Sequence, residues 1–154
     1  MEPETIRALF AALRDEKVDY VLVGALAMDV LGIGRLTEDV DLFVRPTAEN
    51  VDRLRHALRR VWHDPSIDEI TAADLAGDYP AIQYVAPDGT TIDLLSRLGD
   101  AFAFADLEAT VYTYGDVAVK VATPDTLYRM KRDTVRLRDK ADAQVLKEKF
   151  GLKD

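Results

Sequence analysis

Asp39 and Asp41 are the residues of this sequence whose type and spacing most clearly suggest chemistry. They lie two positions apart in a short apolar segment. Because successive side chains of a β-strand alternate between its faces, both carboxylates project from the same side. A fold gains little from two adjacent like charges on one strand face. A divalent cation that also contacts a phosphate would make the arrangement favourable, so the pair predicts a metal site.

A third carboxylate, Asp93, lies in a later apolar segment between Ile92 and Leu94. An aspartate in such a strand needs a partner or an edge position in water. If its strand lies beside that of Asp39 and Asp41, the three carboxylates form one cluster. Such a cluster fits two Mg²⁺ ions about 3.5–4 Å apart, as used for in-line displacement at a phosphate. Oxygen ligands suit Mg²⁺ or Mn²⁺ over zinc, and we therefore expect all three aspartates to be metal ligands.

The residues before the aspartate pair offer candidate phosphate ligands. Gly24 permits close backbone approach, and the free N–H groups of Gly24 and Ala25 at the start of a helix favour a phosphate. The structural alternative for Gly24 is a tight packing turn between strand and helix. Arg35 and Thr37 directly precede the carboxylates. Arg35 could pair with a phosphate or only neutralise the neighbouring acids, and the sequence leaves both alternatives open.

A group of charged residues near the C-terminus could complete the site. Lys131 is a candidate for contacting a triphosphate or for assisting proton transfer. Asp139 and Asp142, which follow Arg138, are three residues apart and would share one face of a helix. The alternative is a solvated helix surface with weak ion pairs.

The elements that must position these residues follow from apolar periodicity and turn residues. Helix-like segments alternate with short apolar strands, then two hairpins follow, and Thr123-Pro124 opens a C-terminal helix. This order predicts an α+β fold, a mixed β-sheet with helices packed largely on one side and a C-terminal helical segment. The predicted helices cover 3–16, 25–31, 48–62, 71–75 and 124–150, with a break near 136–139; the strands cover 19–23 and 39–45, and the hairpins 81–95 and 109–121.

Length and composition predict one soluble globular domain. The 154 residues suffice for a single domain with a sizeable core, which we expect over 1–154, with the core at about 18–122 and C-terminal helices at about 124–150. The absence of cysteine excludes disulfides and zinc–thiolate sites. The N-terminus is amphipathic and acidic, unlike a signal peptide, and no apolar run approaches ~18 residues. We therefore expect a cytoplasmic protein without membrane contact.

The charge is unevenly distributed along the chain. The net charge of −8 combines −12 over residues 1–119 with +4 over residues 120–154. An acidic protein is a poor general nucleic-acid binder, because backbone affinity depends on neutralising phosphates. A basic C-terminal segment beside an acidic pocket does suit a phosphate-bearing acceptor such as tRNA, although surface charge could also simply vary along the chain.

Together these motifs resemble the nucleotidyltransferase superfamily of DNA polymerase β-like fold. The closer similarity is to the AbiEii-like nucleotidyltransferases of toxin–antitoxin and phage-defence systems, and it spans roughly Tyr20 to Leu146. The segments that carry the resemblance are Gly24-Ala25, Gly34 to Asp41 as an Arg-x-Thr-x-Asp-x-Asp motif, Asp93, and Lys131 followed by Arg138-Asp139-x-x-Asp142.

The resemblance implies an enzyme that moves a nucleoside monophosphate from an NTP such as ATP to a hydroxyl acceptor, with release of pyrophosphate. The acceptor would be tRNA, protein or a small molecule, and a cognate toxin or antitoxin protein would be a partner. By this resemblance the catalytic residues are Asp39, Asp41, Asp93 and Lys131, and the nucleotide-binding residues are Gly24, Ala25, Arg35, Thr37, Arg138 and Asp142.

Two other functions remain open from the sequence. A non-catalytic regulatory or antitoxin module of the same fold is favoured by the short chain and by Ala25, because relatives usually carry glycine or serine there. The three carboxylates argue against it. An antibiotic-modifying nucleotidyltransferase is the other alternative, since an acidic pocket suits a cationic aminoglycoside.

Overall fold

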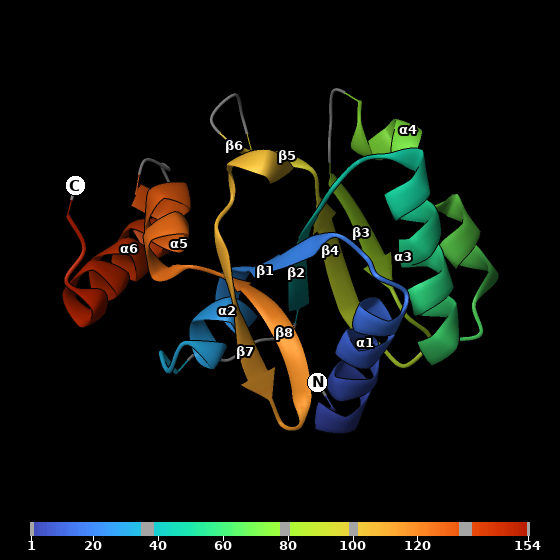
Figure 1. The fold of residues 1–154 in the computed structure, drawn as a ribbon, viewed down its shortest axis with the longest axis horizontal. Helices are drawn as coiled ribbons and strands as arrows, with labels where there is room; N and C mark the ends of the chain where they lie inside the picture. The colour runs from blue at the N-terminus through green and yellow to red at the C-terminus, as the bar shows by residue number, and fades with distance from the viewer. Residues whose placement is uncertain (1, 35–38, 78–80, 99–101, 133–136, 154) are drawn as a thin grey trace.

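The computed structural model describes residues 2–34, 39–77, 81–98, 102–132 and 137–153. Within these residues one six-stranded mixed sheet forms the centre of the molecule, with strand order β3-β4-β2-β1-β8-β7 (Figure 1). A two-stranded ribbon, β5-β6, is separate from it. The strands are β1 Tyr20–Val23, β2 Asp39–Val44, β3 Ala81–Val85, β4 Thr91–Leu95, β5 Arg97–Leu98, β6 Phe102–Ala103, β7 Ala109–Tyr114 and β8 Val117–Ala122.

Two pairs of helices flank the strands in the view of Figure 1. Figure 1 shows α1 and α3 together at the right of the molecule and α5 with α6 at the left. None of the helices among the described residues is long and apolar enough to cross a membrane. The helices are α1 Pro3–Asp15, α2 Gly24–Val30, α3 Ala48–Val61, α4 Ala72–Leu75, α5 Pro124–Arg132 and α6 Leu137–Phe150, with 3₁₀ turns η1 Pro65–Glu69 and η2 Phe104–Asp106.

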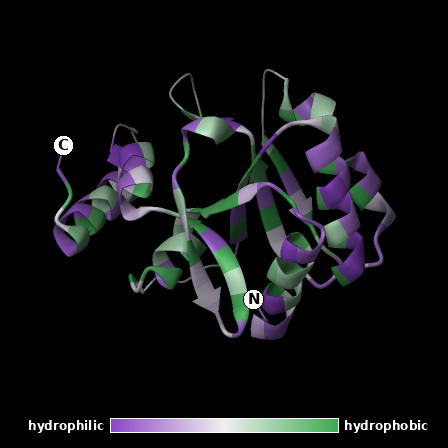
Figure 2. Ribbon diagram, viewed as in Figure 1, coloured by the Kyte–Doolittle hydropathy of each residue, from purple (hydrophilic) through white to green (hydrophobic). Residues whose placement is uncertain are grey.

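Sequence periodicity explains how the helices cover the sheet. The apolar stripe of α1, which includes Phe10, is buried. The ring of Phe10 lies 6.0 Å from that of Tyr20, so α1 packs on the sheet face to which Tyr20 contributes. Figure 2 shows the same division, with apolar residues along the central strands and hydrophilic residues on the outer surface of α3.

Strand pairing separates the core residues from the carboxylates. β2 runs antiparallel to β1 and parallel to β4. Because side chains alternate, Val40, Leu42 and Ile92 are buried on one face. Asp41 and Asp93 alternate with these residues and therefore project from the opposite face.

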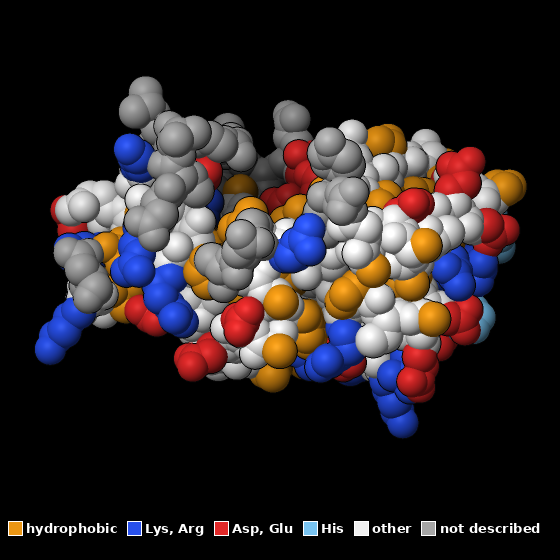
Figure 3. Space-filling model, turned by 90° about the horizontal axis from the view of Figure 1, so that it is seen from above, with side chains coloured by type: hydrophobic (Ala, Val, Ile, Leu, Met, Phe, Trp, Pro, Cys, Tyr) orange, Lys and Arg blue, Asp and Glu red, His pale blue; other side chains and the backbone are white. Residues whose placement is uncertain are grey.

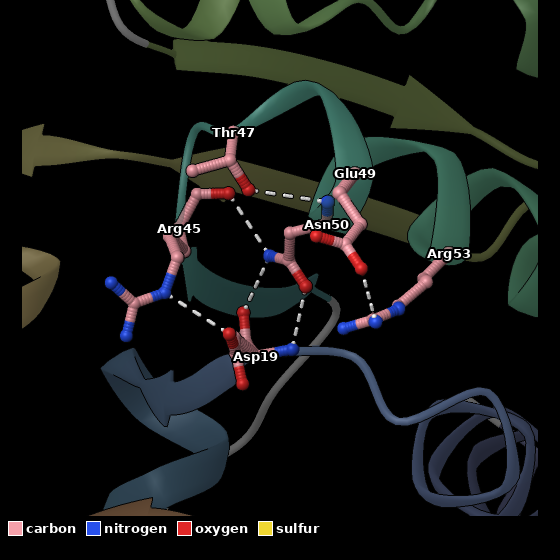
Figure 4. A network of polar contacts seen from close by, with 6 residues as sticks. All are labelled: Asp19, Arg45, Thr47, Glu49, Asn50 and Arg53. Atoms are coloured by element: carbon pink, nitrogen blue, oxygen red, sulfur yellow. Dashed lines mark hydrogen bonds and ion pairs between the residues drawn. The ribbon is translucent and has the colours of Figure 1, made fainter.

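A buried asparagine, Asn50, joins the start of β1 to the end of β2 (Figure 4). The Asn50 side chain donates hydrogen bonds to the carbonyls of Asp19 and Arg45 at 2.9 Å and accepts one from the Asp19 N–H at 2.7 Å. Asp19 and Arg45 also form an ion pair at 3.0 Å. These bonds hold the start of β1 against the end of β2, and the register then places Val23 opposite Asp41.

The predicted α+β class is confirmed, and most elements lie within a residue or two of their predicted bounds. Both predicted hairpins form, with turns at Pro87-Asp88-Gly89 and Gly115-Asp116. Thr123 caps α5 through its hydroxyl, which accepts from the Thr126 N–H at 3.2 Å. The sequence predicted one helical segment over 124–150 with a break near 136–139. The structure has two helices there, α5 ending at Arg132 and α6 beginning at Leu137, and residues 133–136 lie outside the described residues.

Candidate active site

The sheet register brings two of the predicted carboxylates together. In the parallel pairing of β2 with β4, Asp41 lies opposite Asp93, whereas Asp39 lies opposite Thr91. Directly paired residues share a sheet face, so the Asp41 and Asp93 side chains are neighbours. Chain segments about fifty residues apart therefore contribute to one carboxylate pair.

Gln83 belongs to this site, although the sequence did not indicate it. It lies on β3 opposite Asp93 and donates its side-chain amide to Asp93 Oδ1 at 3.1 Å. This bond orients the Asp93 carboxylate. The signal that could have revealed Gln83 is the hairpin register, because counting outward from the three-residue turn Pro87-Asp88-Gly89 places it opposite Asp93.

Gly24 is explained by its close contact with Asp41. Its φ is +75°, a conformation that favours glycine. A Cβ atom at this position would overlap a carboxylate oxygen of Asp41 and lie 2.7 Å from its Cγ. The tight strand-to-helix turn is thus a structural requirement of the site. Phosphate binding by the backbone N–H groups of Gly24 and Ala25, where α2 begins, stays a prediction.

The environment of Asp41 disfavours its negative charge. Burial has the largest effect, followed by the charge and hydrogen bond of Asp93 and then the charge of Asp39, and together they raise the pKa of Asp41 to about 7. The positive charge of Lys131 acts in the opposite direction, which shows that this lysine lies within electrostatic reach of the pair.

The donor chemistry of the pair fits a hard divalent cation. Two neighbouring carboxylates repel each other, and their oxygens are the ligands that Mg²⁺ and Mn²⁺ prefer. The described residues contain no group of three or more acidic or histidine side chains arranged to hold a metal ion. Asp41 and Asp93 are therefore the strongest candidate ligands, and participation of Asp39 stays a prediction. Figure 3 shows acidic side chains in a hollow near the middle of the upper face.

Lys131 is held between two aspartates of the following helix. Its Nζ lies 3.1 Å from Asp142 Oδ2 and 3.5 Å from Asp139 Oδ1. The side chains of Lys131 and Asp142 are only 14% and 5% exposed. The alternative of a fully solvated helix surface is therefore wrong for these residues. The ion pairs join α5 to α6 and present the lysine at a defined position.

Three other predicted site residues cannot be placed with the carboxylates. Arg35 and Thr37 lie outside the described residues. Arg138 lies in α6, and its side chain is outside the described set. Their proposed roles in nucleotide binding stay predictions.

Comparison with known proteins identifies the family of this chain. A search of curated proteins gave no significant match. The family model for the AbiEii nucleotidyl transferase toxins of type IV toxin–antitoxin systems matches residues 7–144, which include Gly24, both paired carboxylates and the Lys131–Asp142 ion pair. This match covers most of the chain, and the protein belongs to the AbiEii nucleotidyl transferase toxin family.

Proposed function

We propose that this protein transfers a nucleoside monophosphate from an NTP to a hydroxyl acceptor in the presence of Mg²⁺ or Mn²⁺. The observation that carries the proposal is the half-buried pair of Asp41 and Asp93, with Gly24 packed against Asp41. Family membership supports the transferase class independently of this geometry.

The chain's own residues have distinct roles in this proposal. Asp41 and Asp93 provide carboxylate oxygens, with Asp39 as a further donor. A divalent cation bound there would offset the charge of the triphosphate. Lys131 adds positive charge near the phosphates from its position on α5. Gly24 leaves room for the Asp41 carboxylate, and the Gln83 amide orients Asp93.

The proposed reaction is an in-line displacement at the α-phosphorus. The acceptor oxygen forms a new bond to phosphorus while the α–β phosphoanhydride bond breaks, and pyrophosphate leaves with the bonding electrons. The hydroxyl proton passes to the Asp93 carboxylate as general base. We expect tRNA or a protein hydroxyl as acceptor and a cognate antitoxin as partner. The toxin family supports such a partner.

Labelled-nucleotide transfer provides the test. The purified protein is incubated with each α-³²P-labelled NTP, Mg²⁺, tRNA and a cell extract, with and without EDTA. We expect label in a macromolecular or small-molecule product, none with EDTA, and a loss on the order of 10²- to 10³-fold in Asp41→Asn or Asp93→Asn, the scale for losing one preorganised electrostatic group.

Asp52→Asn is the matched control, because Asp52 is an exposed aspartate on α3. Its activity should equal that of the wild type. Thermal melts identify unfolding, and Asp41→Asn should melt no lower than the wild type because the substitution removes repulsion from Asp93. Transfer that persists in EDTA would contradict the metal requirement. A wild-type protein that labels no acceptor would favour the non-catalytic module instead.

A further inference from the structure

The outer strand β7 has an open edge that is well suited to pairing with another chain. β8 is its only strand neighbour in the described sheet, and the two pair in unbroken register over six residues (Figure 1). Charged residues and proline commonly protect a sheet edge from added strands. β7 contains neither. Val111, in the middle of β7, is 62% exposed.

A cleft of about 260 Å³ lies directly beside this edge. It is lined by Val111 of β7, Lys120 of β8 and the end of α1 with the residues that follow it. Val111 and Lys120 are directly opposite each other across β7 and β8, so they share one face. Tyr20 also lines the cleft. It begins β1, whereas Gly24 follows the other end of that strand, so the cleft is separate from the carboxylate pair.

The rim of the cleft is positively charged although the protein is acidic overall. Arg14, Lys17 and Lys120 line it, and Asp19 is the acidic residue of the lining. Asp19 is paired with Arg45, and Arg14 with Asp15.

Neither Lys17 nor Lys120 lies within ion-pair distance of a carboxylate among the described residues. The Lys120 ammonium instead lies 5.8 Å from the centre of the Tyr20 ring. Two cations are therefore available at this surface.

Lys17 adopts a left-handed backbone conformation, which is energetically more favourable for glycine than for lysine. Its φ is +57°, and it is the only non-glycine residue with positive φ in the described part of the chain. The position terminates α1, where the Val18 N–H donates to the Leu13 carbonyl at 3.0 Å. Glycine is the usual residue at such a helix end. Lysine at this position therefore places a cation at the rim of the cleft at a cost in backbone strain.

We propose that β7 and the adjoining cleft bind an extended segment of a partner protein. The segment adds a strand to β7, inserts an apolar side chain into the cleft beside Val111, and places acidic side chains against Lys17 and Lys120. Added strands gain affinity from main-chain hydrogen bonds and specificity from pockets for alternate side chains. A second copy of this chain is a poor occupant, because β7 has no acidic residue and self-pairing would bring the cations of both copies together.

A designed strand peptide tests this proposal directly. The probe contains Glu-Thr-Leu-Thr-Glu, which presents a leucine between two glutamates on one face, and the control peptide carries lysine in place of each glutamate. We expect the acidic peptide to shift the NMR amide signals of β7 and to slow their hydrogen exchange. The lysine peptide should leave both unchanged.

Substitutions on the protein separate binding from folding. Lys17→Gly removes a cation and relieves the positive-φ conformation, so it should melt no lower than the wild type while binding the acidic peptide about two- to fivefold more weakly. Val111→Glu should weaken binding about tenfold through repulsion of the glutamates. Val85→Glu is its matched control, because Val85 is 55% exposed on β3 at the opposite edge of the sheet. It should bind like the wild type.

Several results would overturn the proposal. Equal binding of the acidic and lysine peptides, or unchanged binding in Val111→Glu, would show that the cationic cleft takes no part in peptide binding. A wild-type dimer in analytical ultracentrifugation that Val111→Glu converts to a monomer would assign the edge to self-association. The nucleotidyl transfer reaction is tested separately, since Asp41→Asn should leave peptide binding unchanged and Val111→Glu should leave transfer unchanged.

Discussion

At the scale of single residues, the tightest steric contact described in the site is between Gly24 and Asp41. The two positions were both singled out in the sequence, but for different reasons, namely phosphate approach and metal binding. The structure shows that the glycine is needed because the carboxylate occupies the space where a Cβ would lie. A requirement for glycine therefore does not by itself indicate a phosphate.

Gly24→Ala should disrupt the carboxylate pair. The added Cβ meets Asp41, and the φ of +75° is unfavourable for alanine, so we expect a destabilisation of about 2–4 kcal/mol together with loss of transfer activity. Urea unfolding and the labelled-nucleotide assay measure the two effects. Gly34→Ala is the matched control, since a Cβ there has no atom within 4 Å. Equal behaviour of the two variants would contradict this reading of the turn.

At the scale of secondary-structure elements, polar side chains at element ends set the relative positions of strands and helices. Asn50, from the first turn of α3, joins the start of β1 to the end of β2. Asp64, which precedes η1, contacts both that turn and β3 through Tyr84. Such contacts help to position the strands that carry Asp41 and Asp93, although Asn50 and Asp64 do not belong to the candidate active site.

Asn50→Ala should destabilise the fold by about 2–3 kcal/mol, because it leaves the part-buried Asp19 N–H and Arg45 carbonyl without their hydrogen-bond partner. Chemical denaturation provides the measurement. The control is Glu49→Ala, the adjacent exposed residue of α3, which pairs with Arg53 at the surface and should change stability by less than about 0.5 kcal/mol. A similar small effect for Asn50→Ala would show that water replaces the lost bonds.

Asp64 should make stability depend on pH in the acidic range. Its carboxylate accepts hydrogen bonds from the Ser66 hydroxyl, the Ser66 N–H and the Tyr84 hydroxyl, which lower its pKa below the usual 3.8. A folded-state pKa below the unfolded value gives stabilisation that is present above the unfolded pKa and is lost as pH falls through the folded pKa.

Asp64→Asn should therefore lower the melting temperature at pH 7, and the difference from the wild type should shrink as pH falls below about 3.9. Thermal melts monitored by circular dichroism across this range measure the effect. A melting-temperature difference that stays constant from pH 7 to pH 3 would show that the carboxylate charge contributes nothing.

At the scale of the whole molecule, two regions of different character lie at opposite ends of β1. The carboxylate pair and Gly24 lie where β1 ends, and the cation-rimmed cleft beside β7 lies where it begins. The basic C-terminal segment also contributes locally, because Lys131 acts on Asp41 through its charge. The net charge of −8 thus conceals positive groups on either side of the sheet.

The sequence predicted the elements well where local signals were strong. The apolar stripe of α1, the turn at Pro87-Asp88-Gly89 and the Thr123 cap each depend on neighbouring residues, and each appears in the structure. Residues 99–107 have no clear apolar period in the sequence, and their described part contains β6 and η2, elements of two and three residues. Elements so short carry too few side chains to establish a periodic pattern.

The sequence by itself determined that Asp39 and Asp41 share a strand face, that Asp93 lies in an apolar strand, and that the resemblance is to nucleotidyltransferases. These properties follow from side-chain alternation and local motifs. Only the tertiary structure decided that Asp41, rather than Asp39, lies opposite Asp93, and that Lys131 is held by Asp139 and Asp142. Register and helix packing join residues distant in the chain, and their free energy comes from contacts that no local pattern contains.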